Sequence, residues 1–164
     1  MSLLAADGAR SFGPICDLLF VYGTLRRGFS HHRILKRLRA RPVGQGSVQA
    51  ELYDLGAFPG ARPAAPDFSV GSPVDAVAPG PRAQGRPVPR VVGELYRLQN
   101  PERDLQVLDG YEGFRPSDPG RSFFRRKLAE VLPCGRPAKP AWVYWLNRRV
   151  APGRLIVEGD YALR

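Results

Sequence analysis

The chain has 164 residues, carries a formal net charge of +10 and is 43% apolar. Its length suits a single domain over residues 1–164, and its apolar content is enough to fill a core, which excludes an intrinsically disordered chain. The 18 glycines and 17 prolines follow no three-residue period, which excludes collagen and predicts long irregular loops.

Neither the cysteines nor the first residues point to an extracellular or membrane protein. Cys16 and Cys134 are far apart in sequence, so we expect two unpaired, buried thiols rather than a disulfide framework or a structural zinc site. Residues 1–10 lack the regions of a secretory signal, and the apolar run 18–22 is far shorter than the roughly 20 residues of a membrane span. We therefore expect a cytoplasmic protein with no membrane partner.

In chain order, a loose tail over residues 1–16 precedes a short buried strand at 17–22. A helical stripe of Ile34, Leu35 and Leu38 predicts a helix over 30–40 that Pro42 stops. Residues 60–90 are rich in Pro, Gly, Ala and Arg and are expected to form an inserted loop, because they offer few large apolar side chains to a core.

The remaining elements complete the expected architecture. Strands are predicted at 48–55, 91–98, 123–132 and 140–146, with a short last element at 155–157. A second helix is expected to be capped by Asn100, to begin at Pro101, to present Leu105, Val107 and Leu108 as apolar positions, and to end near Gly110. Five or six strands and two helices predict an α+β or mainly-β architecture with a closed or nearly closed sheet.

Several functional motifs are weighed and set aside. Residues 44–46 begin like a dinucleotide fingerprint but lack its third glycine and precede a strand. His31 and His32 are the only histidines, and adjacent helical residues point about 100° apart, so a metal site or a Ser-His or Cys-His centre is not expected. The basic run over 26–41 could hold phosphates, yet no aromatic ladder accompanies it, and a solvated helix face is the favoured interpretation over a nucleic-acid partner.

Two segments carry the functional interpretation. At residues 21–28 a buried strand breaks at Gly23, which allows successive N–H groups to point into one concavity suited to an anion or oxyanion. At residues 108–114 Glu112 follows a short helix and is flanked by Tyr111 and Phe114, whose rings could desolvate the carboxyl group and raise its pKa. Taken alone, each segment also fits an ordinary strand end and a surface loop.

In this order, and with the strands between them, the segments resemble the gamma-glutamylcyclotransferase-like (AIG2-like) family. The resemblance covers positions 18 to about 161 and rests on five stretches: Val21-Tyr22-Gly23-Thr24-Leu25, Glu51-Leu52-Tyr53-Asp54-Leu55-Gly56 with Phe58-Pro59-Gly60, Val92-Gly93-Glu94-Leu95-Tyr96, Leu108-Asp109-Gly110-Tyr111-Glu112-Gly113 and Ala141-Trp142-Val143-Tyr144. It implies a small mixed β-barrel flanked by a few helices. It also implies release of 5-oxoproline from a γ-glutamyl amine, amide or small peptide.

The resemblance further implies the roles of individual residues. Glu112 takes the place of the family's catalytic glutamate, and the turn of Tyr22, Gly23, Thr24 and Leu25 takes the place of its substrate-binding turn. Arg125 and Tyr144 complete the expected substrate-binding set, and the reaction requires no cofactor or metal. The expected partner is therefore a small γ-glutamyl compound, with the leaving amine and the oligomeric state left open.

One departure and one alternative accompany this expectation. Family members often carry a tyrosine before the arginine that opens the strand after the glutamate loop, whereas this chain has Phe123 and Phe124 before Arg125. The lost hydroxyl affects substrate identity more than the reaction. The alternative is a non-catalytic AIG2-like protein that binds a small carboxylated ligand or acts as a regulator.

Overall fold

The computed structural model describes residues 15–64, 87–151 and 154–164. Nearly all of the expected tail (1–16) and most of the expected loop (60–90) lie outside the described residues. The part of the expected loop that is described departs from the prediction, because Pro59–Pro63 form strand β3 and pair with the end of the preceding strand.

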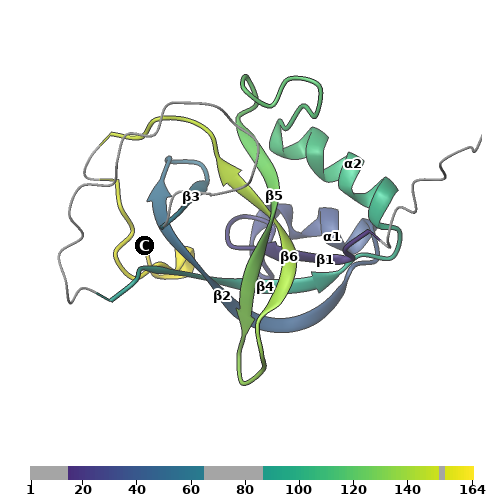
Figure 1. Ribbon diagram of the computed structural model, residues 1–164, viewed down its shortest axis with the longest axis horizontal. Helices are drawn as coiled ribbons and strands as arrows, with labels where there is room; N and C mark the ends of the chain where they lie inside the picture. The colour runs from purple at the N-terminus through teal and green to yellow at the C-terminus, as the bar shows by residue number, and fades with distance from the viewer. Residues whose placement is uncertain (1–14, 65–86, 152–153) are drawn as a thin grey trace, which may run out of the picture.

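The centre of the molecule is a closed barrel (Figure 1). Its strands are β1 (Leu18–Val21), β2 (Arg41–Asp54), β4 (Arg90–Arg97), β5 (Phe124–Pro133) and β6 (Lys139–Leu146). They follow the order β2-β4-β1-β6-β5, and a β2–β5 pairing closes the barrel while β3 pairs with β2. Strands β1 and β6 run parallel and the other pairs antiparallel, which makes the barrel mixed. The predicted α+β barrel with a few flanking helices is confirmed.

Strand β1 explains how the barrel packs on both sides. All four of its residues are buried, although side chains along a strand alternate between its two faces. Leu18 and Phe20 enter the apolar cluster that includes Leu52, whereas Leu19 and Val21 enter a second cluster with the helices. A continuous apolar run is therefore required here rather than an alternating one.

The first helical segment is shorter than the sequence pattern predicts. A 3-10 turn, η1 (Ser30–His32), leads into α1 (Arg33–Arg37), and Arg39 adopts a left-handed φ of 54°. The chain then enters β2 at Arg41, so the expected strand start at 48 is wrong by seven residues and Pro42 lies within a strand. Pairing of the first half of β2 with β4 outweighs the weak strand propensity of these residues.

Helix α2 (Pro101–Glu112) begins as predicted and ends two residues later than Gly110. The Asn100 side chain accepts a hydrogen bond from the N–H of Arg103, which caps the helix. Its C-terminal residue is followed by Gly113, whose left-handed φ of 65° suits a glycine cap. Of the apolar positions expected on this helix, Leu105 and Leu108 are buried, but Val107 is wrongly placed because it is 48% exposed.

The predictions for the last strand and for the cysteines are only partly confirmed. The expected last strand at 155–157 is a single bridge between Tyr53 and Leu155, followed by a 3-10 turn, η2 (Tyr161–Leu163). Both cysteines are free thiols as expected, but Cys16 is only partly buried and Cys134, next to the end of β5, is exposed. No helix among the described residues is long and apolar enough to span a membrane.

Candidate active site

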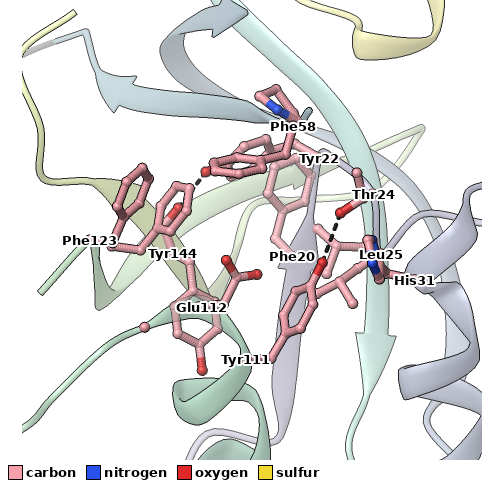
Figure 2. A pocket seen from close by; sticks show the side chains of 15 residues that line it. Phe20, Tyr22, Thr24, Leu25, His31, Phe58, Tyr111, Glu112, Phe123 and Tyr144 are labelled. Atoms are coloured by element: carbon pink, nitrogen blue, oxygen red, sulfur yellow. Dashed lines mark hydrogen bonds between the residues drawn. The ribbon is translucent and has the colours of Figure 1, made fainter. Parts of the chain in front are cut away.

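A cavity of about 410 Å³ lies beside the end of β1, at the C-terminal end of α2 (Figure 2). The turn after β1 forms one wall, α2 contributes a second, and residues in or next to β1, η1, β3, β5 and β6 contribute the rest. The lining residues are Phe20, Val21, Tyr22, Gly23, Thr24, Leu25, His31, Phe58, Pro59, Tyr111, Glu112, Gly113, Phe123, Phe124 and Tyr144. Six of the seven site residues predicted as catalytic or substrate-binding thus lie around one space, and Arg125 is the exception.

The turn after β1 depends on a glycine. A Cβ atom added at Gly23 would lie 2.8 Å from Cγ and 3.0 Å from Cδ of Pro59, so only glycine allows the two segments to approach this closely. The N–H of Arg26 donates to the carbonyl of Gly23 at 3.0 Å and closes the turn. Within the described part of the chain, no hydrogen bond uses the N–H groups of Gly23, Thr24 or Leu25, so these donors are available to a ligand.

Buried charges hold the other end of this turn. Arg26 is only 6% exposed, and its Nη1 lies 2.6 Å from a carboxylate oxygen of Asp160 in the C-terminal segment. The Glu94 carboxylate accepts from the N–H of Arg27 at 3.0 Å and from the hydroxyl of Tyr96 at 2.8 Å. The pKa of Asp160 is lowered, because its bonds to Arg26 and to the Ala162 N–H outweigh the opposing effect of burial. Both ends of the turn are therefore fixed to the barrel.

Glu112 is the last residue of α2, and its carboxylate points away from the helix into the cavity (Figure 2). Among the described residues, no hydrogen bond or ion pair reaches this carboxylate. Burial among the aromatic side chains of the wall raises the pKa of Glu112 from 4.5 to about 8. The result is a carboxyl group that holds or releases a proton close to neutral pH, in contact with the cavity.

One helical turn earlier, Asp109 has partners on two strands. It accepts a hydrogen bond from the Tyr144 hydroxyl at 2.7 Å and forms an ion pair with Arg126 Nε at 2.9 Å. The Arg126 guanidinium in turn lies 4.7 Å from the ring centroid of Trp142. These contacts tie the end of α2 to β5 and β6 and so orient Glu112. Our sequence interpretation did not identify Asp109 or Arg126 as parts of the site, although the three-residue spacing from Glu112 puts Asp109 on a neighbouring helical position.

The two predicted tyrosines line the cavity with their hydroxyl groups already bound. The Tyr22 hydroxyl donates to the carbonyl of Tyr144 at 2.6 Å and accepts from the N–H of Ala61 at 3.2 Å. Burial raises the pKa of both tyrosines well above the ordinary range, with the Asp109 hydrogen bond adding to the effect at Tyr144. Their rings shape the wall while their hydroxyl groups connect β1, β3, β6 and α2.

A polar contact that the sequence did not predict joins the expected site residue Thr24 to Tyr111 on another side of the cavity. The Thr24 hydroxyl and the Tyr111 hydroxyl are 3.0 Å apart, so they join the turn after β1 to α2 (Figure 2). The ring of His31 packs 5.4 Å from the Tyr111 ring, centroid to centroid. Both Tyr111 and His31 line the cavity.

The structure does not bring Arg125 to the cavity. Its Nε donates to the carbonyl of Pro119 at 3.1 Å, and it does not line the space around Glu112. The reason is strand alternation, because Phe124 lines the cavity and its neighbour along β5 must point to the opposite face. Among the described residues no group of three or more His, Cys, Asp or Glu side chains could hold a metal ion.

The fold and the cavity define a class of protein, a small mixed β-barrel with a cavity in its wall. Among the described residues that line this cavity, one carries a carboxyl group. The family described as Gamma-glutamyl cyclotransferase, AIG2-like, matches the chain over residues 19–163. The chain belongs to this family.

Individual relatives are more distant. A Vibrio cholerae protein named "Putative gamma-glutamylcyclotransferase" is 51% identical over 45 residues, which cover 26% of this chain and 37% of that protein, so the match spans little more than a third of the relative. A mouse AIG2-like protein of known crystal structure has a TM-score of 0.55 at 21% identity and covers 88% of this chain and 87% of its own. An uncharacterised Pyrococcus horikoshii protein has a TM-score of 0.54 at 18% identity, covering 90% and 92%. These two structures bear on the fold alone.

Proposed function

We propose that this protein is a γ-glutamyl cyclotransferase of the cytoplasm, which releases 5-oxoproline and a free amine from a γ-glutamyl amine, amide or small peptide. The observation that carries the proposal is the unpaired Glu112 carboxyl group in a cavity that is also lined by the turn of Gly23, Thr24 and Leu25. This combination offers a proton acceptor and a set of unused N–H donors within one cavity.

The substrate supplies its own nucleophile. The α-amino nitrogen attacks the γ-carbonyl carbon, a new C–N bond closes a five-membered ring, and the C–N bond to the leaving amine breaks. The proton lost by the α-amino group is delivered to the leaving nitrogen, so the atoms balance without water. An intramolecular attack of this kind gains several orders of magnitude in effective molarity, which leaves proton transfer and charge stabilisation to the protein.

Glu112 is proposed to carry this proton. With a pKa of about 8, its carboxyl group is matched to an aliphatic amine far better than an exposed glutamate would be. The carboxylate takes one proton from the α-ammonium group, and the resulting acid gives it to the departing nitrogen. The carboxylate formed again takes the second proton from the ring nitrogen and passes it to the released amine. One group therefore acts first as base and then as acid.

The turn after β1 is proposed to hold the negative charges of the reaction. The N–H groups of Gly23, Thr24 and Leu25 are suited to the substrate α-carboxylate or to the oxyanion that develops on the γ-carbonyl oxygen. The rings of Tyr22 and Tyr144 close the wall behind the γ-glutamyl group. Arg125 is left out of the proposed binding set, since its side chain bonds to the Pro119 carbonyl.

The experiment is to measure 5-oxoproline release from a panel of γ-glutamyl compounds by the wild type and by Glu112→Gln. We expect the substitution to lower kcat by about 10²- to 10⁴-fold, the usual contribution of a general acid–base group. Glu130→Gln, at an exposed glutamate of β5, is the matched control and should leave kcat unchanged. Equal turnover by wild type and Glu112→Gln would refute the role of Glu112.

The pH dependence gives a second test of the same proposal. One proton must leave the pair formed by Glu112 and the substrate α-ammonium group before attack begins. The kcat/KM of the wild type should therefore rise as the pH increases through about 8, and the residual activity of Glu112→Gln should lack the part of that rise due to the carboxyl group. Absence of product from every compound, together with thermal stabilisation by one of them, would favour a non-catalytic binding protein instead.

A further inference from the structure

The wall of the cavity has two chemically different ends. The turn after β1 supplies main-chain donors and the Thr24 hydroxyl, whereas Phe58, Phe123 and Phe124 form an aromatic cluster, with ring centroids 5.2 to 6.2 Å apart. Figure 2 shows Thr24 and Phe123 on opposite sides of the Glu112 carboxylate. A substrate whose γ-glutamyl part occupies the polar end therefore extends its leaving group towards the aromatic cluster.

The aromatic cluster is incompletely covered by the protein. Phe124 is 5% exposed and serves as the floor, but Phe58 and Phe123 remain only half-buried although they contact each other edge to face. Phenylalanine rings that face a cavity gain from an apolar partner that removes their surface from water. No cluster residue carries a hydroxyl, so the cluster offers no polar side-chain atom to a ligand.

Charge around the cluster selects against cations. The Arg148 guanidinium lies 5.3 Å from the centroid of the Phe123 ring and is exposed beside it. Glu112 is the one acidic side chain among the described residues that line the cavity, and the reaction occupies it. A cationic side chain on the leaving amine would therefore approach a fixed positive charge with no carboxylate of its own to pair with.

We propose that the leaving amine carries a neutral aromatic or long aliphatic side chain, which packs on Phe58 and Phe123, and that amines with a cationic side chain are rejected. This inference rests on the proposed function, because it names the substrate class of the same site. The phenylalanine cluster and Arg148 then select the leaving amine, whereas Glu112 transfers the proton.

The experiment compares kcat/KM for four dipeptides, each with its γ-glutamyl group on the α-amine of the second residue: phenylalanine, norleucine, lysine and glycine. Norleucine and lysine have side chains of nearly equal length and differ chiefly in charge. We expect the first two to exceed the glycine compound by at least about tenfold, as for added apolar surface in a pocket, and lysine to fall about tenfold below norleucine.

Pairs of matched variants test which residues cause the preference for neutral, apolar leaving amines. Phe58→Ala should reduce the phenylalanine-to-glycine ratio several-fold, whereas Leu128→Ala, which shortens an exposed side chain of β5 outside the cavity, should preserve it. Arg148→Glu should raise the lysine-to-norleucine ratio, whereas Arg149→Glu makes the same charge change at the next exposed residue and should have a smaller effect. Ratios are compared because they are insensitive to losses of folded enzyme.

The outcomes separate this inference from the function on which it rests. Turnover of all four compounds at equal kcat/KM, or a preference for lysine, would overturn the inference and leave the cyclotransferase activity standing. Absence of 5-oxoproline from all four and from every compound of the wider panel would overturn the proposed function, and calorimetric binding of the four compounds to the wild type would then decide the specificity. Tighter binding of the phenylalanine than of the glycine compound supports the inference, and equal or absent binding overturns it.

Discussion

Replacing Glu112 by glutamine should stabilise the protein while it removes the activity. Glutamine has nearly the shape of glutamate and cannot ionise. Burial raises the pKa of Glu112 from 4.5 to about 8, which means that the folded state holds the proton more tightly than the unfolded chain does. The folded protein therefore bears a cost whenever the pH forces this group to ionise.

The size of this cost follows from the two pKa values. A change of one pKa unit corresponds to 1.36 kcal/mol, so the interval from 4.5 to about 8 corresponds to about 5 kcal/mol at most. Water in the cavity reduces this figure, and about 2–5 kcal/mol is expected. Below pH 4.5 the group is protonated in both states, so its ionisation does not reduce the free energy of unfolding. As the pH rises the unfolded chain ionises first, so the wild type loses stability until the pH passes about 8.

The assay is urea unfolding of both proteins at pH 5, 7 and 9. The variant's advantage over the wild type should grow by about 2–5 kcal/mol between the lowest and highest pH, which corresponds to roughly 5–15 °C in Tm. The two proteins are compared by how their free energies of unfolding change with pH. A buried glutamine amide lowers the variant's stability by the same amount at every pH and so does not affect this change. Glu130→Gln should run parallel to the wild type. A pH-independent difference for Glu112→Gln would refute the argument that burial controls this carboxyl group.

Two further substitutions test how the site is held. Gly23→Ala brings a Cβ to 2.8 Å from Pro59 and should displace the turn, which lowers kcat/KM at least about tenfold. Its control, Gly110→Ala, has open space in α2 and should leave kcat/KM unchanged while it stabilises the fold slightly in urea unfolding. Asp109→Asn leaves Arg126 without its anionic partner, so urea unfolding should show a loss of about 3 kcal/mol, and single-turnover kinetics should show a lower rate of ring closure. A rate unchanged by Asp109→Asn would mean that Glu112 is aimed without it.

The sequence pattern predicted the strands whose apolar residues are buried along most of their length. Strand β1 shows four consecutive apolar residues, and in β6 the side chains of Trp142, Tyr144 and Leu146 share one face, as their alternate positions predict. The first half of β2 could not be identified in this way, because Arg41 and Pro42 are exposed and become strand through pairing with β4. The number of strands predicted a closed or nearly closed sheet, but not which strands pair, since pairing between distant strands leaves no local signal.

In the candidate site, too, the features that depend on residues distant in the sequence were not predicted. Glu112 and the turn at Gly23 were predicted as site residues from the family resemblance, since each short motif alone also fits a surface loop or a strand end. The raised pKa of Glu112 depends on aromatic walls contributed by distant segments. Arg125 does not line the cavity, because a strand's two faces alternate and the sequence does not state which face meets the cavity. The Asp109–Arg126 pair joins residues 17 apart, so only the folded chain reveals it.

Helix α2 places two carboxyl groups one turn apart in opposite environments, and this contrast assigns their roles. Asp109 is bound by a hydroxyl and a guanidinium, so its oxygens are occupied in holding α2 against β5 and β6. Glu112 has no such partner among the described residues and faces the cavity, so its proton is free to move. If Glu112 had partners like those of Asp109, the helix would carry the same charges, but the cavity would hold no unpaired carboxyl group able to accept a proton near pH 8. The catalytic proposal therefore depends on the pairing of Asp109 as much as on the isolation of Glu112.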